Sequence, residues 1–186
     1  PLFIDGVRET THPYRVLAVR GGIELTRACG ERALLETLPR CALPLRDALN
    51  TGDPAVIAVT LELLVEFTRA SPAVGEALVP YYRQLLPRLN ALKDVDDVYV
   101  SLARLADARS WRERPPRGRG NAGEDENDES TTLPRETELI GRGRSKRNIG
   151  SLVRRALRAL ERRGGADALA NIKYHIPTYR SCARVE

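Results

Sequence analysis

The sequence predicts an all-α protein, an irregular helical solenoid of the armadillo or HEAT type with a long mobile insertion and an extended C-terminal tail. Apolar residues recur at steps of three and four, as on one face of a helix. Turns of two to four residues separate these segments, which is typical of stacked helical repeats. Aromatic residues make up only 5% of the 186 residues, whereas sandwiches and barrels favour aromatic and β-branched residues. The 42% of hydrophobic residues is enough for one domain core.

The N-terminal part predicts several short helices. Gly21 and Gly22 are expected to interrupt one helical pattern. Pro44 is expected to kink or end another, because proline lacks the N–H of a helical hydrogen bond. The expected helices are residues 1–9, 13–20, 23–30, 31–38 and 39–50.

The strongest helical pattern lies between Asp53 and Lys93. Asp53 and Ser71 are each followed by proline, a combination typical of a helix N-cap and first turn. Apolar residues recur at helical spacing after both caps, and only two residues separate the first pattern from the second cap. We therefore predict two amphipathic helices folded back as a hairpin, with further helices on either side to cover their apolar faces.

Helical regularity weakens after Lys93. A helix is expected over residues 94–109. Residues 112–147 are expected to form a mobile loop, because runs of Gly, Pro and charged residues bury little apolar surface. Their charges either neutralise one another in solvent or form an arm that orders on a partner. The chain is thus divided into a helical-repeat part (1–93), an insertion (94–147) and a C-terminal helix and tail that complete the same domain (148–186).

The segment from Asn148 to Gly164 predicts a helix with apolar residues on one face and arginines on the other. Residues 148–186 carry 8 Lys/Arg against 3 Asp/Glu, so the net charge of +5 resides here. An acidic partner would dock on this segment, unless its charges form an ordinary solvated face. Residues 171–182 are expected to be an extended tail packed on the helix. The candidate partner-binding residues are Arg154, Arg155, Arg158, Arg162, Lys173 and Arg180.

Tyr82 and Arg83 are a second candidate binding site. At helical spacing Tyr81 falls on the apolar face of its helix, whereas Tyr82 and Arg83 point elsewhere. Packing between helices is the alternative for all three side chains, since aromatic residues at helical spacing commonly lie in cores.

Other kinds of site find little support. Cys29, Cys41 and Cys182 lack metal-ligand spacing and are expected to be free thiols in a reducing compartment. Cys182 and His175 could be named as a nucleophile and a base, but no third group or oxyanion site accompanies them. We expect no enzyme, no cofactor, no metal and no membrane span.

Six stretches resemble the parkin co-regulated protein family: DG (5–6), HPY (12–14), RGGI (20–23), ALVPYYRQLLP (77–87), ERRGG (161–165) and NIKYHIPTYRSC (171–182). The resemblance covers roughly residues 1–93 and 148–182. It implies a helical solenoid that helps to close the B-tubule onto the A-tubule at the inner junction of axonemal doublet microtubules. It further implies contacts with tubulin, a small all-β junction protein and other axonemal proteins, in the cytoplasm on the ciliary or flagellar cytoskeleton.

Two departures from the family are expected to matter. The stretch 94–147 is longer than the short loop expected there, and the extended N-terminal arm of the family is absent from this chain. The function predicted is that of a structural microtubule-binding protein whose basic residues meet the acidic surface of tubulin. The alternatives are a helical-repeat adaptor for another protein, or a nucleic-acid-binding protein. The pI of about 9.4 favours the latter, whereas the lack of aromatic residues among the basic runs disfavours it.

Overall fold

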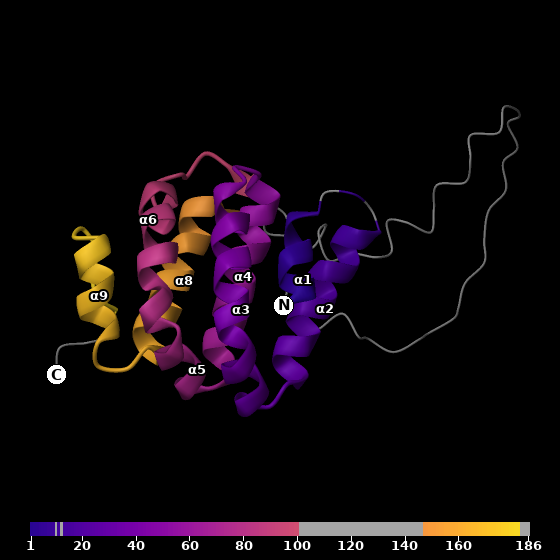
Figure 1. Ribbon diagram of the computed structural model, residues 1–186. Coiled ribbons are helices and arrows are strands. Elements are labelled where there is room, and N and C mark those ends of the chain that lie inside the picture. The colour runs from indigo at the N-terminus through magenta and orange to yellow at the C-terminus, as the bar shows by residue number, and fades with distance from the viewer. Residues whose placement is uncertain (10, 12, 101–146, 183–186) are drawn as a thin grey trace, which may run out of the picture.

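The computed structural model describes residues 1–9, 11, 13–100 and 147–182, and these residues are mostly helical, in agreement with the predicted all-α class. The helices lie side by side in a row, with α1 and α2 at one end and α9 at the other (Figure 1). None of the helices in these ranges has the length and apolarity needed to cross a bilayer. The elements are α1 (Leu2–Asp5), η1 (Gly6–Arg8), α2 (Tyr14–Ala28), α3 (Glu31–Asn50), α4 (Pro54–Ala70), α5 (Pro72–Ala77), η2 (Val79–Tyr81), α6 (Tyr82–Leu92), β1 (Tyr99–Val100), β2 (Arg147–Asn148), α8 (Ile149–Arg163) and α9 (Ala168–His175).

Helix α4 lies at the centre of the fold. Its sequence is apolar almost all round, a composition that suits a helix buried on several sides. Neighbours α2, α3, α5 and α8 pack against it. The predicted start is confirmed, because the Asp53 carboxylate accepts a hydrogen bond from the backbone N of Ala55 at 2.7 Å and Pro54 occupies the first turn.

The second predicted helix starts as expected but is divided. The Ser71 hydroxyl accepts a hydrogen bond from the backbone N of Ala73 at 3.1 Å. The chain then forms α5, the 3-10 turn η2 and α6 in place of one helix to Lys93. Pro80 lies in η2, where its missing N–H interrupts the α-helical ladder. Helix α5 packs on α3, α4 and α8, whereas α6 packs on α3, α8 and α9. The predicted hairpin of two long helices is therefore only partly formed.

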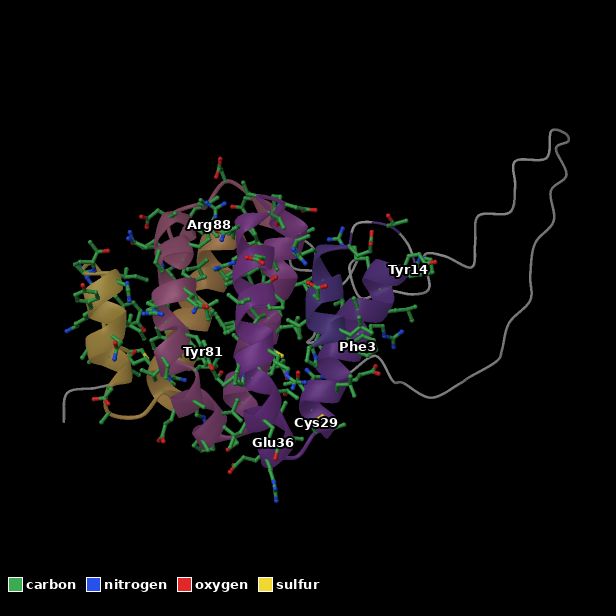
Figure 2. The ribbon with its side chains drawn as sticks, in the orientation of Figure 1. Phe3, Tyr14, Cys29, Glu36, Tyr81 and Arg88 are labelled. Carbon is green, nitrogen blue, oxygen red and sulfur yellow. The ribbon has the colours of Figure 1, made fainter. Side chains whose placement is uncertain are left out.

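The break predicted at Gly21 and Gly22 is wrong, since α2 runs through both residues. A Cβ added to Gly21 would lie 2.4 Å from the ring of Phe3, which rests against α2 (Figure 2). A Cβ added to Gly22 would lie 3.3 Å from Leu63 of α4. The two glycines therefore allow close packing of α1 and α4 on α2 rather than ending the helix.

The boundary predicted between residues 38 and 39 is wrong, and Pro44 does not end a helix, because α3 is one helix that contains Pro39 and Pro44. Each proline removes a helical hydrogen bond. Leu38 and Leu45, which are next to the two prolines, are each only 1% exposed. Their burial holds the segment helical against its local propensity.

The helix predicted for residues 94–109 is wrong in its described part. Residues 99–100 form β1, which pairs antiparallel with β2. The carbonyls of Val95 and Val98 accept hydrogen bonds from the backbone N atoms of Gly150 and Ile149, at 2.8 and 3.0 Å. These carbonyls satisfy the first N–H groups of α8. They do not form the hydrogen bonds of the helix predicted for residues 94–109. Residues 101–109 of that prediction, and 112–146 of the predicted loop, lie outside the described residues.

The C-terminal helix is confirmed, and the tail is partly corrected. Helix α8 is capped by Asn148, whose side-chain oxygen accepts from the backbone N of Ser151 at 2.7 Å. The tail was predicted to be extended from residue 171, but residues 171–175 belong to helix α9. Ala168 and Ile172 lie one helical turn apart and are both buried, which favours the helix. The chain leaves the helix at Ile176, and residues 176–182 return to α8.

Candidate functional site

A narrow strip of α4 reaches the surface between α2 and α8. It carries Glu62, Glu66 and Arg69, which share one side of the helix because they lie four and three residues apart. The side chain of Glu66 is only 9% exposed and that of Glu62 17%. Carboxylates this deeply buried need cationic partners.

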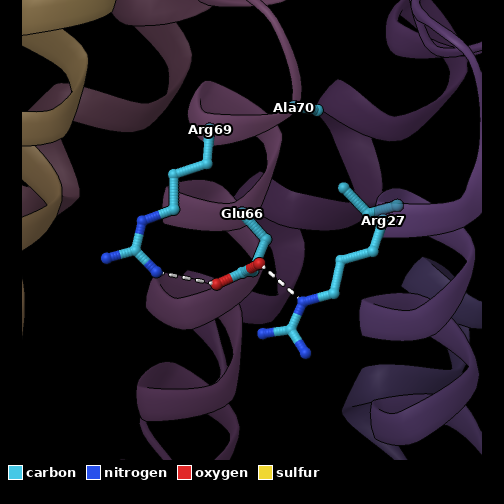
Figure 3. A pocket seen from close by; sticks show the side chains of 5 residues that line it. Arg27, Glu66, Arg69 and Ala70 are labelled. Carbon is cyan, nitrogen blue, oxygen red and sulfur yellow. Dashed lines mark hydrogen bonds and ion pairs between the residues drawn. The ribbon is translucent and has the colours of Figure 1, made fainter. Parts of the chain in front are cut away.

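Glu66 is held by two arginines from different helices. Its two oxygens accept hydrogen bonds from Nε of Arg27 in α2, at 2.9 Å, and from Nη1 of Arg69, at 3.1 Å (Figure 3). Burial would raise the pKa of Glu66, but the hydrogen bonds and charges of the two arginines outweigh it and lower that pKa. The hydrogen bond to Glu66 in turn raises the pKa of Arg27. Both shifts favour the charged forms of Glu66 and Arg27.

Two of the predicted partner-binding arginines form ion pairs within the protein. Arg155 is hydrogen-bonded to Glu62, which also lies 3.6 Å from Arg147 of β2. On the other side of α8, Arg154 donates to the carbonyl of Lys93 at 2.9 Å and to Asp96 at 3.0 Å. Arg155 thus joins α8 to α4, and Arg154 joins α8 to the segment that follows α6.

Arg158 and Arg162 are exposed and form no ion pair with any described residue. They share one side of α8 with Arg155, since the three positions are separated by three and four residues. Lys173 of α9 and Arg180 of the tail are also exposed and have no ion-pair partner within the described ranges. Part of the charge predicted on α8 therefore has no counter-charge among residues 1–9, 11, 13–100 and 147–182.

Helix α8 runs parallel to α4, which brings these arginines onto one surface. Arg155 meets Glu62 near the middle of both helices. Beyond the end of α4, a Cβ on Gly75 of α5 would lie 2.2 Å from the backbone oxygen of Arg163, the last residue of α8. Helices α4 and α8 each rise about 1.5 Å per residue. The residues seven positions after Glu62 and after Arg155 therefore lie level with each other. Those residues are Arg69 and Arg162. We define the basic face as Arg27, Arg69, Arg155, Arg158 and Arg162, set around Glu62 and Glu66.

The basic face offers recognition of anions by guanidinium groups, which suit carboxylates and phosphates. Sequence periodicity predicted its α8 part but missed Arg27 and Arg69. The available signal was the pair of acids at positions 62 and 66 in an otherwise apolar helix. Within the described part of the chain, no group of three or more His, Cys, Asp or Glu side chains is placed to hold a metal ion.

The second candidate site is only half exposed. Tyr82 is 1% exposed, its hydroxyl donates to the carbonyl of Leu160 at 3.2 Å, and burial raises its pKa. The predicted outward orientation of Tyr82 is therefore wrong, and Tyr81 is the half-buried residue. The tighter turn η2 just before α6 shifts the helical phase, which brings Tyr82 to the inner face. Arg83 is exposed on α6.

Glu161 fastens the C-terminal tail to α8. Its carboxylate accepts hydrogen bonds from the Tyr179 hydroxyl at 2.8 Å, from the backbone N of Cys182 at 2.9 Å and from the Cys182 thiol at 2.7 Å, and it is also bonded by Ser181. Burial would raise the pKa of Glu161, but these donors lower it to about 2. The thiol considered above as a nucleophile thus serves as a donor to Glu161.

The Glu161→Gln variant is expected to lose stability at neutral pH and to differ less from the wild type in acid. The pKa of Glu161 is about 2 in the fold, below its ordinary value of 4.5. Its stabilising contribution is therefore present above pH 4.5 and is lost as the pH falls towards 2. Urea unfolding followed by circular dichroism at several pH values would measure this. Glu24→Gln, at an exposed i,i+4 pair, is the control. A Glu161→Gln difference that stays constant between pH 5 and pH 2 would contradict the assignment.

Comparison with known proteins covers nearly the whole chain. A family model described as Parkin co-regulated protein matches residues 1–116 and 129–181. A curated relative from Mus musculus, named Parkin coregulated gene protein homolog, is 36% identical over 183 residues. The alignment covers 98% of this chain and 60% of the relative, so the chain spans about 60% of the length of that protein. Within the predicted insertion, 94–147, the family match leaves out residues 117–128.

Proposed function

The chain belongs to the Parkin co-regulated protein family, and on that premise we propose that it is a structural microtubule-associated protein of the ciliary or flagellar axoneme. In this proposal it binds tubulin and a small all-β junction protein, among other axonemal proteins, and helps to join the B-tubule to the A-tubule at the inner junction. It acts in the cytoplasm on the axonemal cytoskeleton and catalyses no reaction. The row of helices supports an irregular armadillo- or HEAT-like solenoid as the scaffold (Figure 1).

The basic face carries this proposal. Its five arginines surround two carboxylates, and Arg158 and Arg162 have no counter-charge among the described residues. The outer surface of tubulin is acidic, and opposite charges attract over a Debye length of about 8 Å at physiological ionic strength. The proposed docking surface is therefore the basic face, and Lys173, Arg180 and Arg83 are proposed as additional contacts outside it.

Two other functions have some support. Guanidinium groups also contact nucleic-acid phosphates, so the same face would suit a nucleic-acid-binding protein. Exposed apolar side chains at the α1–α2 end, including Leu2, Tyr14 and Leu17, would suit a helical-repeat adaptor for another protein. Neither alternative accounts for the family membership.

Co-sedimentation with stabilised microtubules at low and moderate salt, with an equal mass of RNA as competitor, tests the proposal. We expect pelleting that survives RNA and weakens as salt rises, because the contact is electrostatic. Loss of pelleting to RNA would favour nucleic-acid binding. If the folded chain fails to pellet even when the all-β junction protein is added, the microtubule proposal is wrong and an adaptor is favoured.

A further inference from the structure

A small pocket lies between the C-terminal ends of α2 and α4 (Figure 3). Its lining residues are Thr26, Arg27, Glu66, Arg69 and Ala70, and its volume is about 270 Å³. This is below the range of roughly 300–1,000 Å³ that is typical of small-molecule sites. The pocket therefore has room for one side chain or one small anion rather than for a cofactor.

The pocket presents two oriented guanidinium groups. Each guanidinium has five N–H donors, and Arg27 and Arg69 each use one nitrogen on Glu66. Their remaining donors have no partner among the described residues, and the two side chains are 46% and 58% exposed. Both oxygens of Glu66 are already used, so this carboxylate fixes the position of the guanidinium groups and leaves their other edges open.

The local charge balance decides which anion fits. Arg27 and Arg69 lie in the last turns of α2 and α4, where each helix end carries about −0.5 of an elementary charge. Together with Glu66, these helix ends nearly cancel the two arginines. A small free anion therefore gains little from the net charge of the pocket. An anion gains more when it belongs to a polyanion that also reaches Arg158 and Arg162, whose positive charge has no counter-charge in the part of the chain that the structure describes.

We propose that this pocket binds one carboxylate of an acidic, glutamate-rich peptide segment, whose other carboxylates lie along α8. Packed helices are roughly 8–10 Å apart, so about three residues of extended peptide at ~3.3 Å each span the distance from Arg69 to Arg162. The inference rests on the proposed function in one respect, since it assigns to the partner a flexible acidic segment in addition to a folded surface.

Arginine-to-lysine substitutions keep the positive charge of the side chain. They therefore test the geometry of the pocket separately from the electrostatic attraction of the whole basic face. Arg27→Lys and Arg69→Lys retain one positive charge each but lose the guanidinium fork. We expect each to bind fluorescent hexaglutamate about fivefold or more weakly at low salt, as measured by anisotropy. Arg40→Lys, at an exposed arginine of α3 outside the basic face, is the matched control and should bind like the wild type.

Equal binding by Arg27→Lys, Arg69→Lys and the wild type, with unchanged circular dichroism, would overturn the pocket assignment. Displacement of hexaglutamate by inorganic phosphate at equal total charge would also overturn it, because that result indicates a small-anion site. We expect phosphate to compete poorly. Microtubule pelleting of the wild type is measured independently, so failure of the pocket and failure of the proposed function give different results.

Discussion

Replacing Arg158 and Arg162 together by glutamate is expected to weaken microtubule binding at least about fivefold. Each exposed ion pair contributes ~0.2–1 kcal/mol. The double reversal removes two attractions and adds two repulsions of similar size, so the total loss is about 1–4 kcal/mol. Because ~1.4 kcal/mol corresponds to a factor of ten in affinity, this loss is measurable by co-sedimentation. Neither arginine has an ion-pair partner in the described structure, so the fold should tolerate the change.

Arg155 is excluded from this variant because its reversal would place a glutamate against Glu62 and separate α8 from α4. The control reverses Arg40, which is exposed on α3 outside the basic face and has no ion-pair partner within the described ranges. The control should pellet like the wild type. Equal pelleting by the Arg158/Arg162 variant, with its helical content intact, would show that the basic face is not the docking surface.

The second large effect concerns stability. Gly75→Ala is expected to destabilise the protein by about 2 kcal/mol, although alanine favours a helix by about 1 kcal/mol over glycine. The new Cβ would lie 2.2 Å from the backbone oxygen of Arg163, and a backbone atom cannot swing away as a side chain can. Overpacking of this kind costs typically 1–3 kcal/mol or more. In a protein of this size, the thermal midpoint should fall by about 4–8 °C.

Gly30→Ala is the control for this experiment. Gly30 precedes α3 with φ of −67°, and a Cβ there would meet nothing within 4 Å. Its midpoint should fall by less than half as much as that of Gly75→Ala. A Gly75→Ala protein as stable as the wild type would mean that α5 and α8 do not approach as closely as described.

Local signals explain what the sequence predicted correctly. The caps at Asp53 and Ser71 were predictable because each depends on a side chain and a backbone N–H two residues away. The apolar face of α8 was predictable for the same reason, since helical spacing alone decides which residues share a side.

The wrong predictions depended on distant neighbours. Gly21 and Gly22 stay helical because Phe3 and Leu63 pack over them, and no local rule identifies those partners. Tyr82 is buried because the preceding 3-10 turn changes the phase of α6. In each case tertiary packing overrides the local pattern.

The candidate site was predicted only in part for the same reason. The α8 arginines were identified from their periodicity. The ion-pair partners of Arg154 and Arg155 are Asp96 and Glu62, which lie 58 and 93 residues away in the sequence. Arg27 joins the site through Glu66, which is 39 residues away. Counting charges along the sequence locates the basic segment. Only the fold shows that Arg154 and Arg155 form ion pairs, whereas Arg158 and Arg162 form none with any described residue.

The most direct test of the proposed docking surface is a cryo-electron microscopy map of the chain bound to microtubules, at a resolution that shows helices. We predict that α4 and α8 face the tubulin lattice, with Arg158 and Arg162 at the contact and the α1–α2 end beside it. A map in which α3 and α6 face the lattice, and the basic face points into solvent, would contradict the proposed mode of binding.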